Sequence, residues 1–443
     1  MENPHASPCT DVFYQLFPDL PTRFTERSLW GPQSTVVCLL ALLNPGVTRS
    51  YRTTLPLMQQ LYGKSWGWDR VPDPRSLTDA RHRLGASPVE DLARRARDQA
   101  LALTRAADIG PQGRRLVAFD GTDLVLPDAP GMRSRFGGPS NQHGESVGVP
   151  HALMVSAWDV VTRVPLGWTL EPYGSDERPG ALKLLPQLGE RDIAIFDRGY
   201  PSYDFLRTLV LEQRDFVIRM IASEAISWPA VYEFLRSGKL EQIVEIDLGA
   251  HPQKPGERVV VKLRLIRKPF RRGRPKAHQH PETSVIATSL IDTEAYPRDE
   301  LLAIYTNRWG IETIHKELKV LCAMENWHTC DHELLRQEIA IIMIWQTMAA
   351  IIQHQAQQHI AQQQDNPWNH PKRKLALRTA TFVAVAELLQ IANQGRSRTT
   401  WQTHLRRQIR LLVTYAQKRR PGRSRARVRK RPFGRFRPTK RAA

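Results

Sequence analysis

Leu116-Val-Ala-Phe-Asp120 and Ile193-Ala-Ile-Phe-Asp197 are the two stretches that decide the fold of this 443-residue chain. Each has four apolar residues followed by an acid, which predicts a short buried strand that ends in an aspartate. Gly121-Thr-Asp should then turn the chain. Three further strands and two helices are predicted nearby, at residues 152–157, 164–170 and 216–220 and at residues 180–188 and 203–213. This order predicts an α/β fold with a mixed sheet flanked by helices.

The chain divides into six predicted segments. Residues 1–112 should form a helical N-terminal domain, and residues 113–221 the first part of the α/β core. A β-rich insertion is expected at 222–292, because its apolar and polar residues alternate. Residues 293–352 should complete the core. They are followed by a C-terminal helical region at 353–417 and a basic tail at 418–443, which we expect to be disordered.

One helix of the N-terminal domain is basic. It begins at Pro74, where a first helical turn tolerates proline, and carries basic residues on one side. Two interpretations stay open. The domain is a DNA-binding head, or it is a helical scaffold with an exposed basic face.

The net charge of +20 and the pI near 10.2 favour a polyanionic partner, nucleic acid first and an anionic membrane surface second. More than half of this charge lies in residues 418–443, a tail that either touches nucleic acid or is translated without a function. Four cysteines make no disulfide framework, and the N-terminus has no export signal. The apolar stretch 339–352 is too short to span a bilayer and predicts a buried helix. We therefore expect a soluble cytoplasmic protein without a membrane partner.

Four polar side chains should share one face of a helix around Glu312. At about 100° per residue, Tyr305, Arg308, Glu312 and Lys319 fall within about 60° of one another. The opposite face carries the apolar residues Ile311, Ile314, Leu318 and Leu321, which would pack on the sheet. The polar face is either solvated and laced with ion pairs, or it holds a ligand.

The two strand-ending aspartates favour the ligand. Asp120 and Asp197 together with Glu312 would give three carboxylates at one sheet edge. Two Mg²⁺ ions prefer such oxygen ligands and support in-line displacement at phosphorus. Arg308 and Lys319 would then hold a strand by its phosphates, since guanidinium and ammonium groups suit that charge.

The spacing Tyr305-x2-Arg308-x3-Glu312-x6-Lys319 resembles the YREK signature of the DDE transposases of the bacterial insertion-sequence-four family. The blocks FDGTDL, with Asp120, and AIFDRGYPSY, with Asp197, resemble the two aspartate blocks of the same family. The resemblance covers about residues 115–350. It implies a ribonuclease-H-like core, with the β-rich insertion between the second aspartate and the glutamate.

The resemblance also implies cut-and-paste DNA transposition through a hairpin intermediate. It implies that Asp120, Asp197 and Glu312 are catalytic and bind two Mg²⁺ ions, for which Mn²⁺ can substitute. Tyr305, Arg308 and Lys319 would contact DNA near the cleaved phosphate. The implied partner is double-stranded DNA, namely the terminal inverted repeats of the element and the target, bound by a homodimer in a synaptic complex near the nucleoid.

Further DNA contacts are hypotheses. Arg198 follows the second aspartate and would reach a phosphate or brace the acid, while Arg133 and Arg135 lie in a Gly-rich loop and are either DNA contacts or ordinary surface arginines. The family's hairpin step is associated with a flipped base stacked on an aromatic side chain. Trp228 and Phe270 are candidates for that side chain, and each is alternatively a packing residue.

Four other interpretations concern zinc, ATP, DNA cleavage without joining, and DNA binding without catalysis. Cys322, His328, Cys330 and His332 have the ligand types of a zinc site but not the paired spacing. A Walker-type phosphate loop is absent from the sequence, which disfavours an ATP-driven machine. A Mg²⁺ nuclease that cuts without joining stays open. A non-catalytic DNA-binding protein derived from a transposase is disfavoured, because a binder gains nothing from acids that face phosphate.

Overall fold

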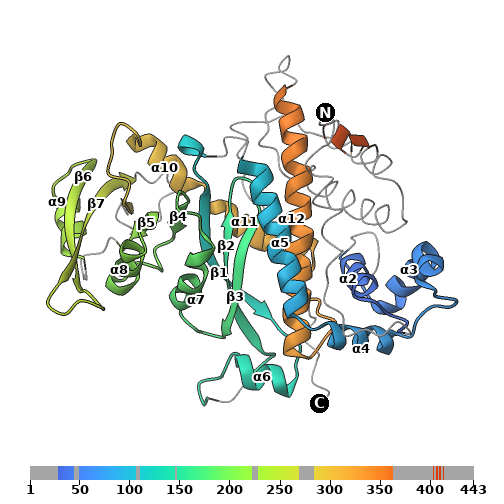
Figure 1. Ribbon diagram of the computed structural model, residues 1–443. Coiled ribbons are helices and arrows are strands. Elements are labelled where there is room, and N and C mark those ends of the chain that lie inside the picture. The colour runs from blue at the N-terminus through green and yellow to red at the C-terminus, as the bar shows by residue number, and fades with distance from the viewer. Residues whose placement is uncertain are drawn as a thin grey trace, which may run out of the picture.

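The computed structural model describes residues 28–43, 49–105, 110–144, 147–221, 228–268 and 284–362, together with residues 403, 406, 407, 409, 410 and 413 (Figure 1). The basic tail 418–443, most of the region 353–417 and Phe270 lie outside the described residues. The predictions made for them therefore stay predictions.

An eight-stranded sheet forms the centre of the molecule, in the order β3-β2-β1-β4-β5-β8-β7-β6. The strands are β1 (Leu116–Val125), β2 (His151–Asp159), β3 (Pro165–Pro172), β4 (Ile193–Phe196), β5 (Asp215–Met220), β6 (Glu241–Ala250), β7 (Arg258–Lys268) and β8 (Ser284–Thr288). Strand β2 pairs antiparallel with both β1 and β3, whereas β4 pairs parallel with both β1 and β5. This confirms the mixed α/β fold and is consistent with a ribonuclease-H-like core.

The β-rich insertion extends this sheet. Strand β8 pairs antiparallel with β5, and β7 and β6 follow in the same order. The insertion therefore does not form a sheet of its own, because its strands continue the hydrogen bonding of the core.

Helices cover both faces of the sheet (Figure 1). The helices are α2 (Pro32–Ala41), α3 (Tyr51–Trp66), α4 (Pro74–Leu84), α5 (Ser87–Arg105), α6 (Pro130–Phe136), α7 (Glu177–Leu184), α8 (Tyr203–Leu211), α9 (Pro229–Arg236), α10 (Arg298–Thr306), α11 (Trp309–Leu321) and α12 (His332–Gln362). One hydrophobic core joins α5, α10, α11 and α12 to one face. A second core joins α7, α8 and α9 to the other.

The N-terminal helices have a small core of their own, which contains Trp30, Tyr62 and Trp68. Arg81 of α4 fixes them to α12, since its guanidinium is fully buried and lies 2.8 Å from the carboxylate of Glu338. Arg81 therefore does not belong to an exposed basic side of α4, because it faces α12 and not solvent.

Three local predictions are wrong. Gly121-Thr-Asp does not turn the chain, because β1 continues through Asp120 and pairs with β2 over nine residues. The segment with Arg133 and Arg135, predicted as a Gly-rich loop, forms the helix α6. The helix around Glu312 is broken at 307–308, where Gly310 and Ile311 bond three residues back, to the carbonyls of Asn307 and Arg308, instead of four.

Helix α12 contains the apolar stretch that sequence analysis assigned to a buried helix. By length and composition it could cross a membrane, but 94% of its most apolar window is buried inside the protein. Its side chains pack on α5 and on the sheet, which confirms a core helix.

Candidate active site

Strand geometry turns Asp120 and Asp197 toward the same face of the sheet. Strands β1 and β4 are parallel, with Ala118 beside Ile195, so that the two acids follow at equivalent positions two residues later. Side chains two residues apart point to the same face. Because Ala118 and Ile195 belong to the core beneath α11 and α12, both aspartates face that side.

Helix α11 brings Glu312 to this face. Its buried residues Ile311, Ile314 and Leu318 fix the helix on the sheet, and Glu312 is left half-buried beside them. The Glu312 carboxylate accepts a 2.6 Å hydrogen bond from Arg308, four residues earlier. Glu312 is thus held by its own helix within electrostatic range of Asp120.

Asp120 lies within electrostatic range of several other carboxylates. The pKa of Asp120 is raised to about 7, mainly by burial and also by the carboxylates of Glu177, Asp197 and Glu312, while the charge of Arg308 opposes them. Negative charge is therefore in excess around this carboxyl, and a cation would relieve it.

Glu177 is a fourth carboxylate that sequence analysis missed. It begins α7, and its Oε2 accepts a 3.1 Å hydrogen bond from the backbone N–H of Gly121, next to Asp120. A Cβ at Gly121 would lie 2.6 Å from the Glu177 carboxylate, so a larger residue at this position would displace Glu177. Burial raises the pKa of the Tyr200 hydroxyl, and the charge of Glu177 raises it as well. In the sequence, the glycine after Asp120 is the one signal that indicates this contact with Glu177.

His315 is the second missed residue. It lies on α11, three residues after Glu312, and its Nδ1 is 3.7 Å from Oδ2 of Asp120. The pKa of His315 is lowered to about 4, mainly by burial and also by the charge of Lys319. The ring is therefore neutral near pH 7.

The structure places the three predicted DNA-contact residues in different surroundings. Tyr305 and Arg308 are buried, at 4% and 8% exposure, and not on an open polar face. Burial raises the pKa of the Tyr305 hydroxyl, and the charge of Arg308 opposes that shift. Lys319 is half-buried, donates to the carbonyl of Asp123 and lies 3.0 Å from the carboxylate of Glu325.

The remaining candidates are dispersed. Arg198 is exposed in the turn after Asp197. Arg133 is tied to Asp128 and to the carbonyl of Gly148. Trp228 is buried and stacks on Tyr203, with ring centroids 4.3 Å apart, which favours the packing interpretation for it.

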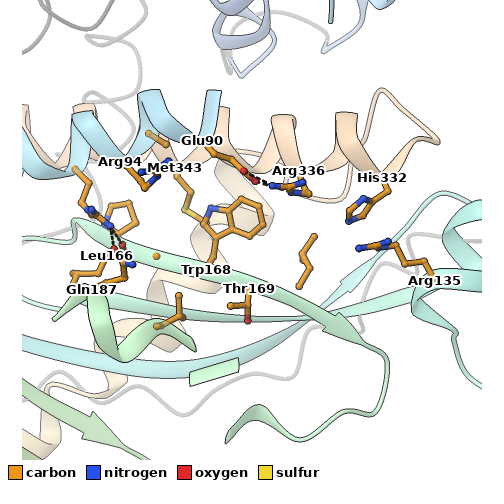
Figure 2. Close-up of a pocket in the computed structure, with 16 residues that line it drawn as sticks. Glu90, Arg94, Arg135, Leu166, Trp168, Thr169, Gln187, His332, Arg336 and Met343 are labelled. Carbon is orange, nitrogen blue, oxygen red and sulfur yellow. Dashed lines mark hydrogen bonds and ion pairs between the residues drawn. The ribbon is translucent and has the colours of Figure 1, made fainter. Parts of the chain in front are cut away.

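Arg135 lines a cavity of about 410 Å³ between α5, β3 and α12 (Figure 2). Trp168 and Met343 form an apolar wall, and Arg336 is held by Glu90 at 2.5 Å. Arg135 lies at the end of the cavity beside His332 (Figure 2). The three predicted catalytic acids do not line this cavity, so Arg135 is not grouped with them.

The donor chemistry of the acids fits a hard divalent cation, because carboxylate oxygens are its preferred ligands. In this structure two of the acids contact other groups of the protein. Asp197 accepts from the backbone N–H of Gly199 at 2.7 Å, and Glu312 is paired with Arg308. Within the described part of the chain, no three Asp, Glu, His or Cys side chains lie close enough together to hold a metal ion.

Comparison with known proteins identifies the family. The model described as the transposase DDE domain matches residues 111–348, more than half of the chain. The chain belongs to the DDE transposase family. Members of this family generally use divalent metal ions.

Two curated relatives come from Escherichia coli (strain K12). Transposase InsG for insertion sequence element IS4 is 27% identical over 254 residues, 56% of this chain and 53% of the relative. Putative transposase InsZ is 29% identical over 134 residues, 30% of this chain and 44% of the relative. The transposase thus matches about half the length of these relatives, and the resemblance to the insertion-sequence-four type is confirmed.

Proposed function

We propose that this transposase excises an insertion sequence by cutting DNA at the element's terminal inverted repeats and joins the freed ends to target DNA, through a hairpin intermediate. The observation that carries the proposal is that Asp197 and Glu312 lie near Asp120 on the face covered by α11, while Glu177 acts on Asp120 from α7. In a family of DNA-rearranging enzymes, such a cluster is suited to phosphodiester chemistry.

Asp120, Asp197 and Glu312 are the proposed catalytic residues and would hold two Mg²⁺ ions, or Mn²⁺ in their place. The cations would supply charge neutralisation and activation of the attacking oxygen at the scissile phosphate. Glu312 would exchange its contact with Arg308 for this role. Arg308, released from Glu312, then offers its guanidinium to a phosphate oxygen.

Tyr305 and Lys319 would hold the DNA near the cleaved phosphate. Lys268 supports this placement, because its ammonium lies 4.8 Å from the centre of the Tyr305 ring and adds positive charge beside Arg308. Arg198, exposed after Asp197, would contact the same strand, and Arg133 and Arg135 of α6 would contact DNA farther along.

The proposed partners are the two element ends and the target, held by a homodimer. In this proposal, residues 1–112 bind the element ends, and the core formed by residues 113–221 and 293–352 carries out catalysis. Residues 222–292 extend the core. Residues 353–417 form a helical region, and the basic tail at 418–443 adds positive charge to the protein. A cytoplasmic, nucleoid-associated location follows from a DNA substrate.

The test is a plasmid that carries the inverted repeats flanking the reading frame. Purified transposase with Mg²⁺ should release the element, and a second plasmid should capture its 3′-OH ends. Asp120→Ala, Asp197→Ala and Glu312→Ala should each abolish release and keep DNA binding. Release without capture would instead assign a nuclease, and binding without release would assign a non-catalytic DNA-binding protein.

A further inference from the structure

A chain of buried polar contacts lies behind Asp120. The indole Nε1 of Trp158 donates to Oγ of Ser156 at 3.0 Å, and Oγ of Ser156 lies 2.8 Å from Nε2 of His315. Nδ1 of His315 then faces Oδ2 of Asp120 at 3.7 Å. Trp158 and Ser156 are fully buried and His315 is 6% exposed, so water does not compete for these contacts.

The chemistry of the donors fixes the direction of this chain. An indole N–H only donates, so Ser156 accepts from Trp158 and its single hydroxyl hydrogen is left to donate to His315. Nε2 is therefore the acceptor, and the ring carries its proton on Nδ1. The opposite direction would leave the buried hydroxyl hydrogen without an acceptor among the described residues and would turn a ring lone pair toward the Asp120 carboxylate.

The chain also joins three elements at the level of the acids. Ser156 of β2 is directly opposite Asp120 of β1 in the antiparallel register, so their side chains are neighbours on one face. His315 lies on α11, three residues after Glu312. A contact between His315 and Ser156 thus fixes the helix that carries Glu312 against the strands that carry Asp120.

We propose that His315 is a positioning residue: held by Ser156 and Trp158, it directs Nδ1–H at Asp120 and so sets the orientation of Asp120 relative to Glu312 for a divalent cation. At 3.7 Å the contact with Asp120 is electrostatic and not a hydrogen bond. Ring and carboxylate groups behind a metal ligand generally fix that ligand's orientation. The inference rests on the proposed function, because it assigns Asp120 to the cation.

Two amide variants of His315 distinguish the roles of its two ring nitrogens. In His315→Asn the amide N–H occupies the place of Nδ1, so the donor toward Asp120 is kept and the contact with Ser156 is lost. His315→Gln reaches Ser156 but has no donor at the Nδ1 place. Ser156→Ala removes the support of the ring with a small change in a buried position, and it serves as a second test should the ring variants unfold.

Electron paramagnetic resonance of added Mn²⁺ measures binding directly, alongside the thermal midpoint and metal-free DNA affinity. His315→Gln and Ser156→Ala should weaken Mn²⁺ binding about 10-fold or more, as loss of groups behind metal ligands does, and His315→Asn by less than about 3-fold. Metal-free DNA affinity should not change.

Equal losses in Asn and Gln variants, or losses of Mn²⁺ binding that only follow the thermal midpoint, would overturn the positioning role and leave a packing residue. Unchanged Mn²⁺ binding in all three variants would overturn it as well. If Asp120→Ala itself keeps full Mn²⁺ binding, the proposed function fails first, and the two failures are therefore distinguishable.

Discussion

Arg81→Met should strongly destabilise the contact between the N-terminal helices and α12. The Arg81 guanidinium lies 2.8 Å from Glu338, donates to Gln337 at 2.9 Å and to the carbonyl of Leu334 at 3.0 Å, and also bonds the hydroxyl of Tyr51. Removing one partner of a buried ion pair costs about 3–5 kcal/mol. Because His328 still donates to Glu338, at 3.2 Å from its backbone N–H, we expect the low end, about 3 kcal/mol.

Urea denaturation followed by tryptophan fluorescence measures this loss. Trp30 and Trp68 lie in the N-terminal core with ring centroids 4.7 Å apart, so their emission reports on these helices. The matched control is Arg75→Met, an exposed arginine of the same helix, which should change the free energy of unfolding by less than about 0.5 kcal/mol.

The double variant Arg81→Met with Glu338→Leu separates charge from packing. A buried pair replaced by apolar residues is often close to neutral, so the double variant should recover at least about 1 kcal/mol relative to the sum of the single changes. Additive losses, or an Arg81→Met midpoint that equals that of Arg75→Met, would refute the role of the buried pair.

Three further predictions concern pH, the glycine beside Asp120 and the tail. Burial raises the pKa of Glu338, but the hydrogen bond from His328 and the charge of Arg81 outweigh burial, so the pKa lies below the ordinary 4.5. Burial lowers the pKa of His328, but the hydrogen bond and charge of Glu338 outweigh burial, so the pKa lies above the ordinary 6.5. The stability that Glu338 contributes is therefore present above pH 4.5 and is lost as the pH falls through its lowered pKa. The stability that His328 contributes is present below pH 6.5 and is lost as the pH rises through its raised pKa. Thermal midpoints from roughly pH 3 to pH 9 should show both limbs, and Glu338→Gln should flatten them. Gly121→Ala should slow plasmid cleavage about 10-fold or more, because the added Cβ displaces Glu177. The control Gly131→Ala has open space around the added Cβ and should leave the rate unchanged. Equal cleavage rates of the two variants would contradict a role of the Gly121–Glu177 contact. Truncation after Gln417 should flatten the salt dependence of DNA binding, and an unchanged slope would exclude the tail from the interface.

Asp120 and Asp197 could be predicted from the sequence because the pattern that identifies them lies in the residues directly before them. Four apolar residues before Asp120 and before Asp197 identify two buried strands, and the YREK spacing identifies Glu312. The continuation of β1 was not predictable in this way. Gly121-Thr-Asp has the composition of a turn, but pairing with β2 holds these residues extended.

The residues that sequence analysis missed depend on distant partners. His315 has the helical position of a core residue, and only the fold brings it to Ser156, 159 residues earlier in the chain. Glu177 reaches Gly121 from the start of α7, on the opposite face of the sheet from α11. Arg81 has the sequence context of a surface base, and its counter-charge Glu338 comes from α12. Pairings of this kind are set by tertiary packing, which periodicity does not encode.

Mn²⁺ binding by variants of the three acids is the most direct test of the central claim. The intact transposase, titrated with and without DNA that carries its inverted repeats, should bind Mn²⁺, and Asp120→Asn, Asp197→Asn and Glu312→Gln should each weaken that binding by about 10-fold or more. Glu325→Gln, which changes a carboxylate paired with Lys319, should bind Mn²⁺ as the unmodified protein does. If all four variants bind Mn²⁺ equally well, the three acids do not form a common cation site.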